Sequence, residues 1–156
     1  MDIRRFPGSR RHPHLAREAL ETALPDAGFD YDWEPRLGGR RSLPKDEPSL
    51  DPWWEVAAFR AYAAYTRTPE FRAGLAQALS RAAGQRVAVM CSETLWWRCH
   101  RRLVADVAVL SCGVRVVHLL PSGPVEHRPS AGARRREDGL LVWDVLESLQ
   151  DGRTVC

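Results

Sequence analysis

A cysteine with reactive neighbours is the clearest chemical feature of this sequence. Cys91 follows the apolar run 87–90, and Glu93 and the group Arg98-Cys99-His100 come soon after it. A thiolate here would be a nucleophile, stabilised by the N–H groups of a following helix and by nearby cations, while Glu93 moves a proton. We therefore predict Cys91, Glu93 and His100 as catalytic residues, with Arg98 and Cys99 completing the pocket wall.

Arginine dominates the basic residues and indicates the chemistry of a ligand. Lys45 is the only lysine among 23 basic residues, and the net charge is +3. Arginine forks onto phosphate or carboxylate better than lysine does, and the glycines at 38–39 would allow a backbone to approach a ligand closely. The predicted substrate-binding residues are Arg4, Arg5, Arg10, Arg36 and Arg98. The first hypothesis is thus an enzyme acting on an anionic, phosphate-bearing substrate.

Other interpretations of the same residues remain open, including whether the chain is an enzyme at all. The arginine clusters and the tryptophans at 33, 53, 54, 96 and 97 would suit a non-catalytic module that binds a nucleotide or nucleic acid. The arginines could equally be surface charges of an interaction protein, and Cys91 a small buried residue at a strand end. Each of these alternatives predicts that replacing Cys91 by Ser changes little.

Metal binding is a weaker alternative. Cys91, Cys99 and His100 could supply three ligands and leave an open position, as in catalytic zinc sites. Their spacing matches no common zinc pattern, and consecutive residues of a helix point about 100° apart. We therefore predict no metal site, and the sequence identifies no cofactor.

Length and composition restrict the class of protein. The 156 residues, 44% of them hydrophobic, suit one domain with a substantial core. No apolar stretch approaches the ~20 residues that span a bilayer, and no apolar leader follows the charged start. We expect a cytoplasmic protein that does not enter a membrane and whose four cysteines are free thiols. The oligomeric state is not predicted.

Helix and strand patterns predict the elements that would position these residues. Helices are expected over 15–24, 53–65 and 97–112, and another after the capping signal Thr68-Pro69-Glu70. Strands are expected over 29–33, 86–91 and 114–120, with a long loop or lid over 35–54. The order strand–helix–strand over 86–120 predicts a parallel pair.

The expected fold is α/β, a Rossmann-like, open and mostly parallel sheet flanked by helices. It would form a single domain over 1–145, with a tail over 146–156. Cys91 would then lie at a strand end, where open α/β sheets bind their ligands.

Four blocks of residues resemble one known family. They are residues 2–13, residues 33–41, the segment Met90-Cys91-Ser92-Glu93 with 97–101, and His127-Arg128 with 133–134 and 138–139. The resemblance is to domain-of-unknown-function family 488, and it implies a Rossmann-like α/β fold without a settled activity. Members of that family usually begin with an extra strand and helix, so by this resemblance Met1 falls inside the second strand. Fold alone does not give function, so the function must be argued from the site.

Overall fold

The chain folds mainly through helices, with two small hairpins of strands. The computed structural model describes residues 1–43 and 48–144. Within these residues lie four α-helices and two antiparallel two-stranded sheets. The helices are α1 (Arg17–Asp26), α2 (Ala57–Tyr65), α3 (Pro69–Ala82) and α4 (Arg101–Cys112), and the strands are β1 (Val117–Leu120), β2 (Gly123–Glu126), β3 (Ala133–Arg135) and β4 (Leu141–Trp143). Three single turns of 3-10 helix complete the elements: η1 (Pro13–Leu15), η2 (Pro35–Leu37) and η3 (Trp96–Arg98).

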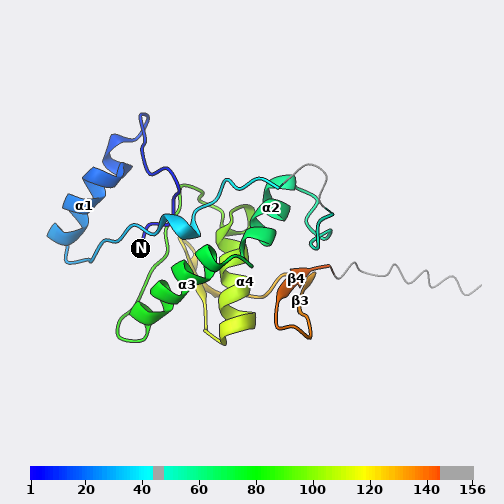
Figure 1. Ribbon diagram of the computed structural model, residues 1–156. Helices are drawn as coiled ribbons and strands as arrows, with labels where there is room; N and C mark the ends of the chain where they lie inside the picture. The colour runs from blue at the N-terminus through cyan, green and yellow to red at the C-terminus, as the bar shows by residue number, and fades with distance from the viewer. Residues whose placement is uncertain (44–47, 145–156) are drawn as a thin grey trace, which may run out of the picture.

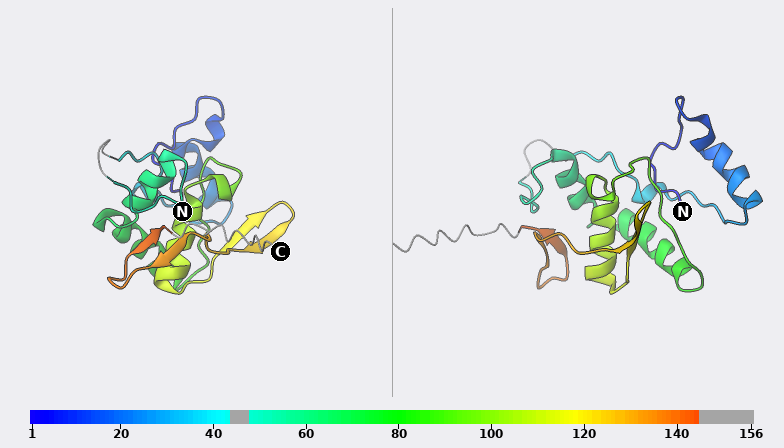
Figure 2. Two further views of the ribbon diagram at one scale, coloured as in Figure 1. Left: turned by 90° about the vertical axis from the view of Figure 1, so that its right-hand side faces the viewer. Right: turned by 180° about the vertical axis from the view of Figure 1, so that it is seen from behind.

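Helices α2, α3 and α4 pack into one body, whereas α1 stands apart from it. Figure 1 and the rotated views of Figure 2 show the segment around α1 projecting away from the other helices. The core between the packed helices and β4 contains the buried side chains of Tyr62, Phe71, Leu103 and Trp143. Burial of such large apolar side chains is the main stabilising contribution to this body.

The start of α3 and the end of α4 lie where capping residues in the sequence predicted them. The Thr68 hydroxyl accepts a hydrogen bond from the N–H of Phe71 at 3.2 Å, and Pro69 occupies the first turn. Gly113 ends α4 with φ of 66°, a left-handed conformation that glycine adopts without a steric penalty. The predicted helix starts at 15, 53 and 97 were each too early, since the helices begin at Arg17, Ala57 and Arg101.

The expected Rossmann-like parallel sheet was wrong. Three segments do run parallel at Asp2, which forms single bridges to Trp33 and to Met90. The pairing stops there because Pro35 lacks an N–H and begins η2, and because the Asp2 carboxylate accepts the N–H of Arg4 at 2.9 Å. The stretch 86–91, predicted as a buried strand, is partly exposed and pairs only at Met90.

The predicted strand–helix–strand unit around α4 was also wrong. Strand β1 pairs in antiparallel fashion with β2, through the two-residue loop 121–122. Gly123, with φ of 117°, closes this turn, so β1 folds back locally and does not join the segment 86–91. The side view in Figure 2 shows this hairpin extending away from the helices.

The long loop predicted over 35–54 is anchored to the core near both ends. Leu37 is buried at one end, and Asp51 is buried at the other. Asp51 forms an ion pair with Arg67 at 2.7 Å and accepts the N–H of Trp143 at 3.2 Å. These bonds join the loop to the turn between α2 and α3 and to β4. The predicted boundary between domain and tail at 145–146 lies outside the described residues.

Candidate thiol site

Two thiols and an imidazole come together between the segment after Met90 and the start of α4. The Nδ1 atom of His100 lies 3.6 Å from Cys99 Sγ and 4.0 Å from Cys91 Sγ. All three atoms lie within 4.8 Å of one another. Cys91 is half-buried and Cys99 is buried, so Cys91 is the more accessible of the two residues. The grouping of Cys91, Cys99 and His100 predicted from the sequence is therefore present.

The backbone between η3 and α4 explains how adjacent residues both reach Cys91. Cys99 is extended, with φ of −128° and ψ of 151°, and His100 caps α4. The two residues therefore lie before the helix, and the 100° separation of consecutive helical side chains does not apply to them. The objection to a metal that rested on that separation was wrong.

The pKa values of the two thiols are shifted in opposite directions. The neighbouring Cys99 thiol, the imidazole of His100 and the backbone N–H of Glu93 together hold the pKa of Cys91 well below its ordinary value despite partial burial. The interaction with Cys91, together with burial, raises the pKa of Cys99. Cys99 lies nearer to His100, but Cys91 is the more accessible of the two. We therefore assign the thiolate to Cys91 and the proton to Cys99.

Arg101 adds a positive charge behind the pair. Its Nε atom donates to Cys99 Sγ at 3.4 Å, and its Nη2 atom donates to the backbone carbonyl of Glu93. Arg101 thereby holds the turn that carries the Glu93 N–H toward Cys91. The Glu93 side chain itself is exposed, and its predicted role in proton transfer stays a prediction.

The second nitrogen of His100 decides which role the imidazole fits best. Nε2 is buried and has no hydrogen-bond partner among the described residues. An imidazole protonated on Nδ1 leaves only a lone pair at Nε2, whereas a metal-bound Nδ1 would leave a buried Nε2–H unsatisfied. Metal-ligating histidines almost always donate from their second nitrogen. The surroundings of His100 therefore favour a hydrogen bond to the thiolate over a metal ligand.

A glycine loop lies against this cluster and brings cations to it. A Cβ atom on Gly39 would lie 2.9 Å from His100 Nδ1, and one on Gly38 would lie 2.8 Å from Arg5 Cβ. The close approach predicted for these glycines is thus made to protein groups. Arg5 Nη1 donates to the carbonyl of Arg40 at 2.8 Å, and Arg40 has a left-handed φ of 58°. Among the described residues, neither guanidinium has a carboxylate partner.

The other predicted anion-binding arginines lie in different surroundings. Arg4 is buried and forms an ion pair with Asp2 at 2.6 Å, while Arg36 pairs with Glu34 at 2.5 Å. Arg10 and Arg98 are exposed. Arg10 precedes η1 and α1 in the chain. Arg5 is therefore the predicted residue best placed to face an anion beside the thiols.

A second polar cluster, which the sequence did not reveal, is built around Asp106 of α4. The buried carboxylate of Asp106 lies 2.8 Å from His127 Nε2, and His127 Nδ1 lies 2.8 Å from His118 Nε2. The ring of Trp96 stacks on His118 with centroids 3.7 Å apart. Burial lowers the pKa of His118 to about 4, aided by the nearby charges of His127 and Arg101. His118 and His127 lie far from Asp106 in the sequence, so no local pattern could have joined them.

The tryptophans mostly pack against the protein itself. Trp33 donates to the Arg4 carbonyl at 2.8 Å, Trp54 is in the core, and Trp96 covers His118. The ring of Trp53 occupies the space where a Cβ on residue 132 would lie. Trp97 is the most exposed of them, at 42%.

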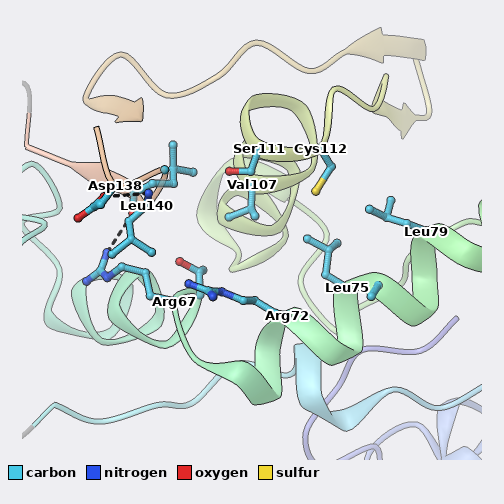
Figure 3. Close-up of a pocket in the computed structure, with 13 residues that line it drawn as sticks. Arg67, Arg72, Leu75, Leu79, Val107, Ser111, Cys112, Asp138 and Leu140 are labelled. Carbon is cyan, nitrogen blue, oxygen red and sulfur yellow. Dashed lines mark hydrogen bonds between the residues drawn. The ribbon is translucent and has the colours of Figure 1, made fainter. Parts of the chain in front are cut away.

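A cavity of about 360 Å³ lies elsewhere, between α3, α4 and the loop before β4. Figure 3 shows Leu75, Leu79 and Val107 on its walls, with Cys112 at one end. Arg67, also in its lining, is already bonded to Asp51 and to the Leu141 carbonyl. Cys91, Cys99 and His100 do not line this cavity.

Fold and site together define a mainly helical protein with a paired-thiol site. A family model, the domain of unknown function DUF488, matches residues 1–108, which include Cys91, Cys99 and His100. The chain belongs to this family. No curated protein and no solved structure matches it. Among the described residues, no helix has the length and apolar character to cross a membrane.

Proposed function

We propose that this chain is a thiol-dependent enzyme in which the Cys91 thiolate attacks an electrophilic centre of an anionic substrate. One observation carries the proposal: the buried Cys99 thiol and the His100 imidazole gather within 4.8 Å of the sulfur of the half-buried Cys91. A buried structural cysteine needs no such neighbours. A nucleophile does, because the thiolate is the reactive form.

The cationic loop supports an anionic substrate. Arg5 and Arg40 are linked through the Arg40 carbonyl, and Gly39 of the same loop contacts His100. Arginine without a carboxylate partner can fork onto phosphate or carboxylate. In this proposal Arg5 holds the anion, Cys91 attacks, and His100 hydrogen-bonds the sulfur before and after the reaction. More specifically, we propose that the anionic group of the substrate is a phosphate.

The test compares Cys91 with Cys112 in one protein. Cys112 is exposed, yet partial burial raises its pKa, so its alkylation by iodoacetamide should rise about tenfold per pH unit up to pH 8. Cys91 alkylation should change less than about twofold between pH 5.5 and 8.5, because its thiolate is already formed. Peptide mass spectrometry separates the two rates. A Cys91 rate that climbs with pH as steeply as that of Cys112 would overturn the proposal.

Inorganic phosphate tests the anion site. It should slow Cys91 alkylation in the parent chain, and Arg5→Ala should remove this protection. Arg115→Ala is the matched control, because Arg115 is exposed just before β1 and forms an ion pair with Glu126. The alternative of a nucleotide or nucleic-acid module rests on the exposed Trp97 and the same arginines. It predicts oligonucleotide binding that weakens with salt and is unaffected by Cys91→Ser.

A further inference from the structure

We propose that Cys91 and Cys99 form a reversible disulfide couple, in which Cys91 reduces a hydroperoxide and Cys99 resolves the oxidised sulfur. This inference rests on the proposed nucleophilic role of Cys91 and adds a second activity to the same site. Its basis is the placement of one accessible and one buried sulfur within 4.8 Å of each other.

The two sulfurs lie within 4.8 Å, so the bond requires them to move closer together. A disulfide requires sulfurs about 2.05 Å apart and Cβ atoms about 3.5–4.5 Å apart. Cys99 is in extended backbone ahead of α4. Its side chain can therefore turn toward Cys91 while the backbone hydrogen bonds of the helix stay in place. Burial of Cys99 excludes outside thiols, and this leaves Cys91 as the sulfur that can reach it.

The first step consumes the peroxide. The Cys91 thiolate attacks one oxygen of the hydroperoxide, the S–O bond forms as the O–O bond breaks, and the departing alkoxide takes a proton from water. Cys91 becomes a sulfenic acid and the peroxide becomes an alcohol. Two electrons have moved from sulfur to oxygen.

The second step depends on a change in the charge around Cys99. The interaction with the Cys91 thiolate is the main cause that raises the pKa of Cys99. A neutral sulfenic acid removes that cause, while Arg101 still donates to Cys99 Sγ at 3.4 Å. Cys99 then loses its proton more readily and attacks the Cys91 sulfur. The S–S bond forms, the S–O bond breaks, and the hydroxide leaves as water with that proton.

Oxidation thus sets the order of the two thiols. Before it, Cys91 is the thiolate and Cys99 the donor. After it, Cys99 is the nucleophile and Cys91 the electrophile. An external dithiol reverses the couple by exchange.

The experiment uses the full chain with Cys112→Ser and Cys156→Ser, which leaves only the two thiols of interest. The reduced protein is treated anaerobically with one equivalent of hydrogen peroxide and digested with trypsin, which cleaves after Arg98. We expect the peptides 87–98 and 99–101 to be joined, and dithiothreitol to separate them. Added Cys99→Ser should instead leave Cys91 as a sulfenic acid that dimedone traps, and Cys91→Ser should slow peroxide consumption at least tenfold.

The outcomes separate this inference from the proposed function. A dimedone adduct on Cys91 with Cys99 still free, in the parent protein, overturns the couple. If Cys91 alkylation is independent of pH but no joined peptide forms, the nucleophile stands and the couple fails. If Cys91 reacts slowly with both reagents, both fail. The joined peptide is measured in a chain that keeps both thiols, so a variant that folds poorly cannot obscure the result.

Discussion

Replacing Asp106 by Ala should be among the most destabilising single changes in this chain. The carboxylate is fully buried and accepts three hydrogen bonds. They come from His127 Nε2 at 2.8 Å, the Ser130 N–H at 3.0 Å and Trp143 Nε1 at 2.9 Å. These bonds tie α4 to the segments that follow β2 and to β4.

The magnitude follows from the donors left behind. Each buried donor without a partner costs about 1–3 kcal/mol, and removing one partner of a buried charged network costs about 3–5 kcal/mol. Asp106→Ala should therefore lower the free energy of unfolding by about 3–5 kcal/mol. Asp106→Asn keeps the shape and one oxygen. With that oxygen toward His127 and Ser130, its NH₂ would face the Trp143 N–H, at a cost of about 1–3 kcal/mol.

The measurement is equilibrium unfolding in guanidinium chloride, followed by circular dichroism and by tryptophan fluorescence. Glu126→Gln is the matched control, because it also removes an acid but from an exposed pair with Arg115 at 3.2 Å. The control should change stability by no more than about 0.5 kcal/mol. A loss below about 1 kcal/mol in Asp106→Ala would refute the reasoning, because three buried donors left without partners should cost more than that.

Three further changes test other parts of the structure. The pKa of His118 lies near 4 in the fold, below its usual 6.5, so the unfolded chain binds more protons between these two pH values. The stability that His118 contributes should be full above pH 6.5 and should fall toward pH 4, by no more than about 1–2 kcal/mol because the side chain is partly exposed. His118→Gln should flatten this pH dependence in equilibrium unfolding. Gly132→Ala should cost about 1–3 kcal/mol because the new Cβ would lie 2.1 Å from the Trp53 ring, whereas Gly84→Ala, with nothing within 4 Å, should be neutral in the same thermal melt. Arg4→Met should cost about 3–5 kcal/mol by leaving its buried carboxylate partner unpaired, yet leave phosphate protection of the thiol unchanged.

Elements defined by neighbouring residues were predictable, and those that need distant partners were not. The Thr68–Pro69 start of α3 and the Gly113 end of α4 are local signals, and both were confirmed. The parallel sheet failed because a strand needs a partner, and Asp2 pairs for one residue on each side. The turn at Pro121–Gly123 is a local hairpin signal that the sequence contained, although the predicted crossover left it unused.

The sequence grouped Cys91, Cys99 and His100, which the structure brings together, but part of the reasoning behind that grouping was wrong. The sequence pattern placed Cys91 ahead of a helix N-terminus at Trp97, whereas α4 begins at Arg101. The donors that stabilise the thiolate are side chains and one N–H of a turn, and no single helix end supplies them. Arg4 was predicted to bind substrate because it belongs to a cluster of arginines. Such a cluster does not reveal that Arg4 is paired with a buried carboxylate, that of Asp2.

The proposed reactivity of Cys91 depends on the break between η3 and α4 at Cys99. The N–H of Cys99 bonds back to the Trp96 carbonyl at 3.1 Å and closes η3, while the N–H of Arg102 bonds to the Cys99 carbonyl at 3.0 Å and opens α4. Cys99 is the extended residue between these two turns. If one continuous helix ran from Trp96, Cys99 and His100 would point about 100° apart and only one could face Cys91. The break at Cys99 lets one thiol, one imidazole and the Arg101 guanidinium act together at a single sulfur pair.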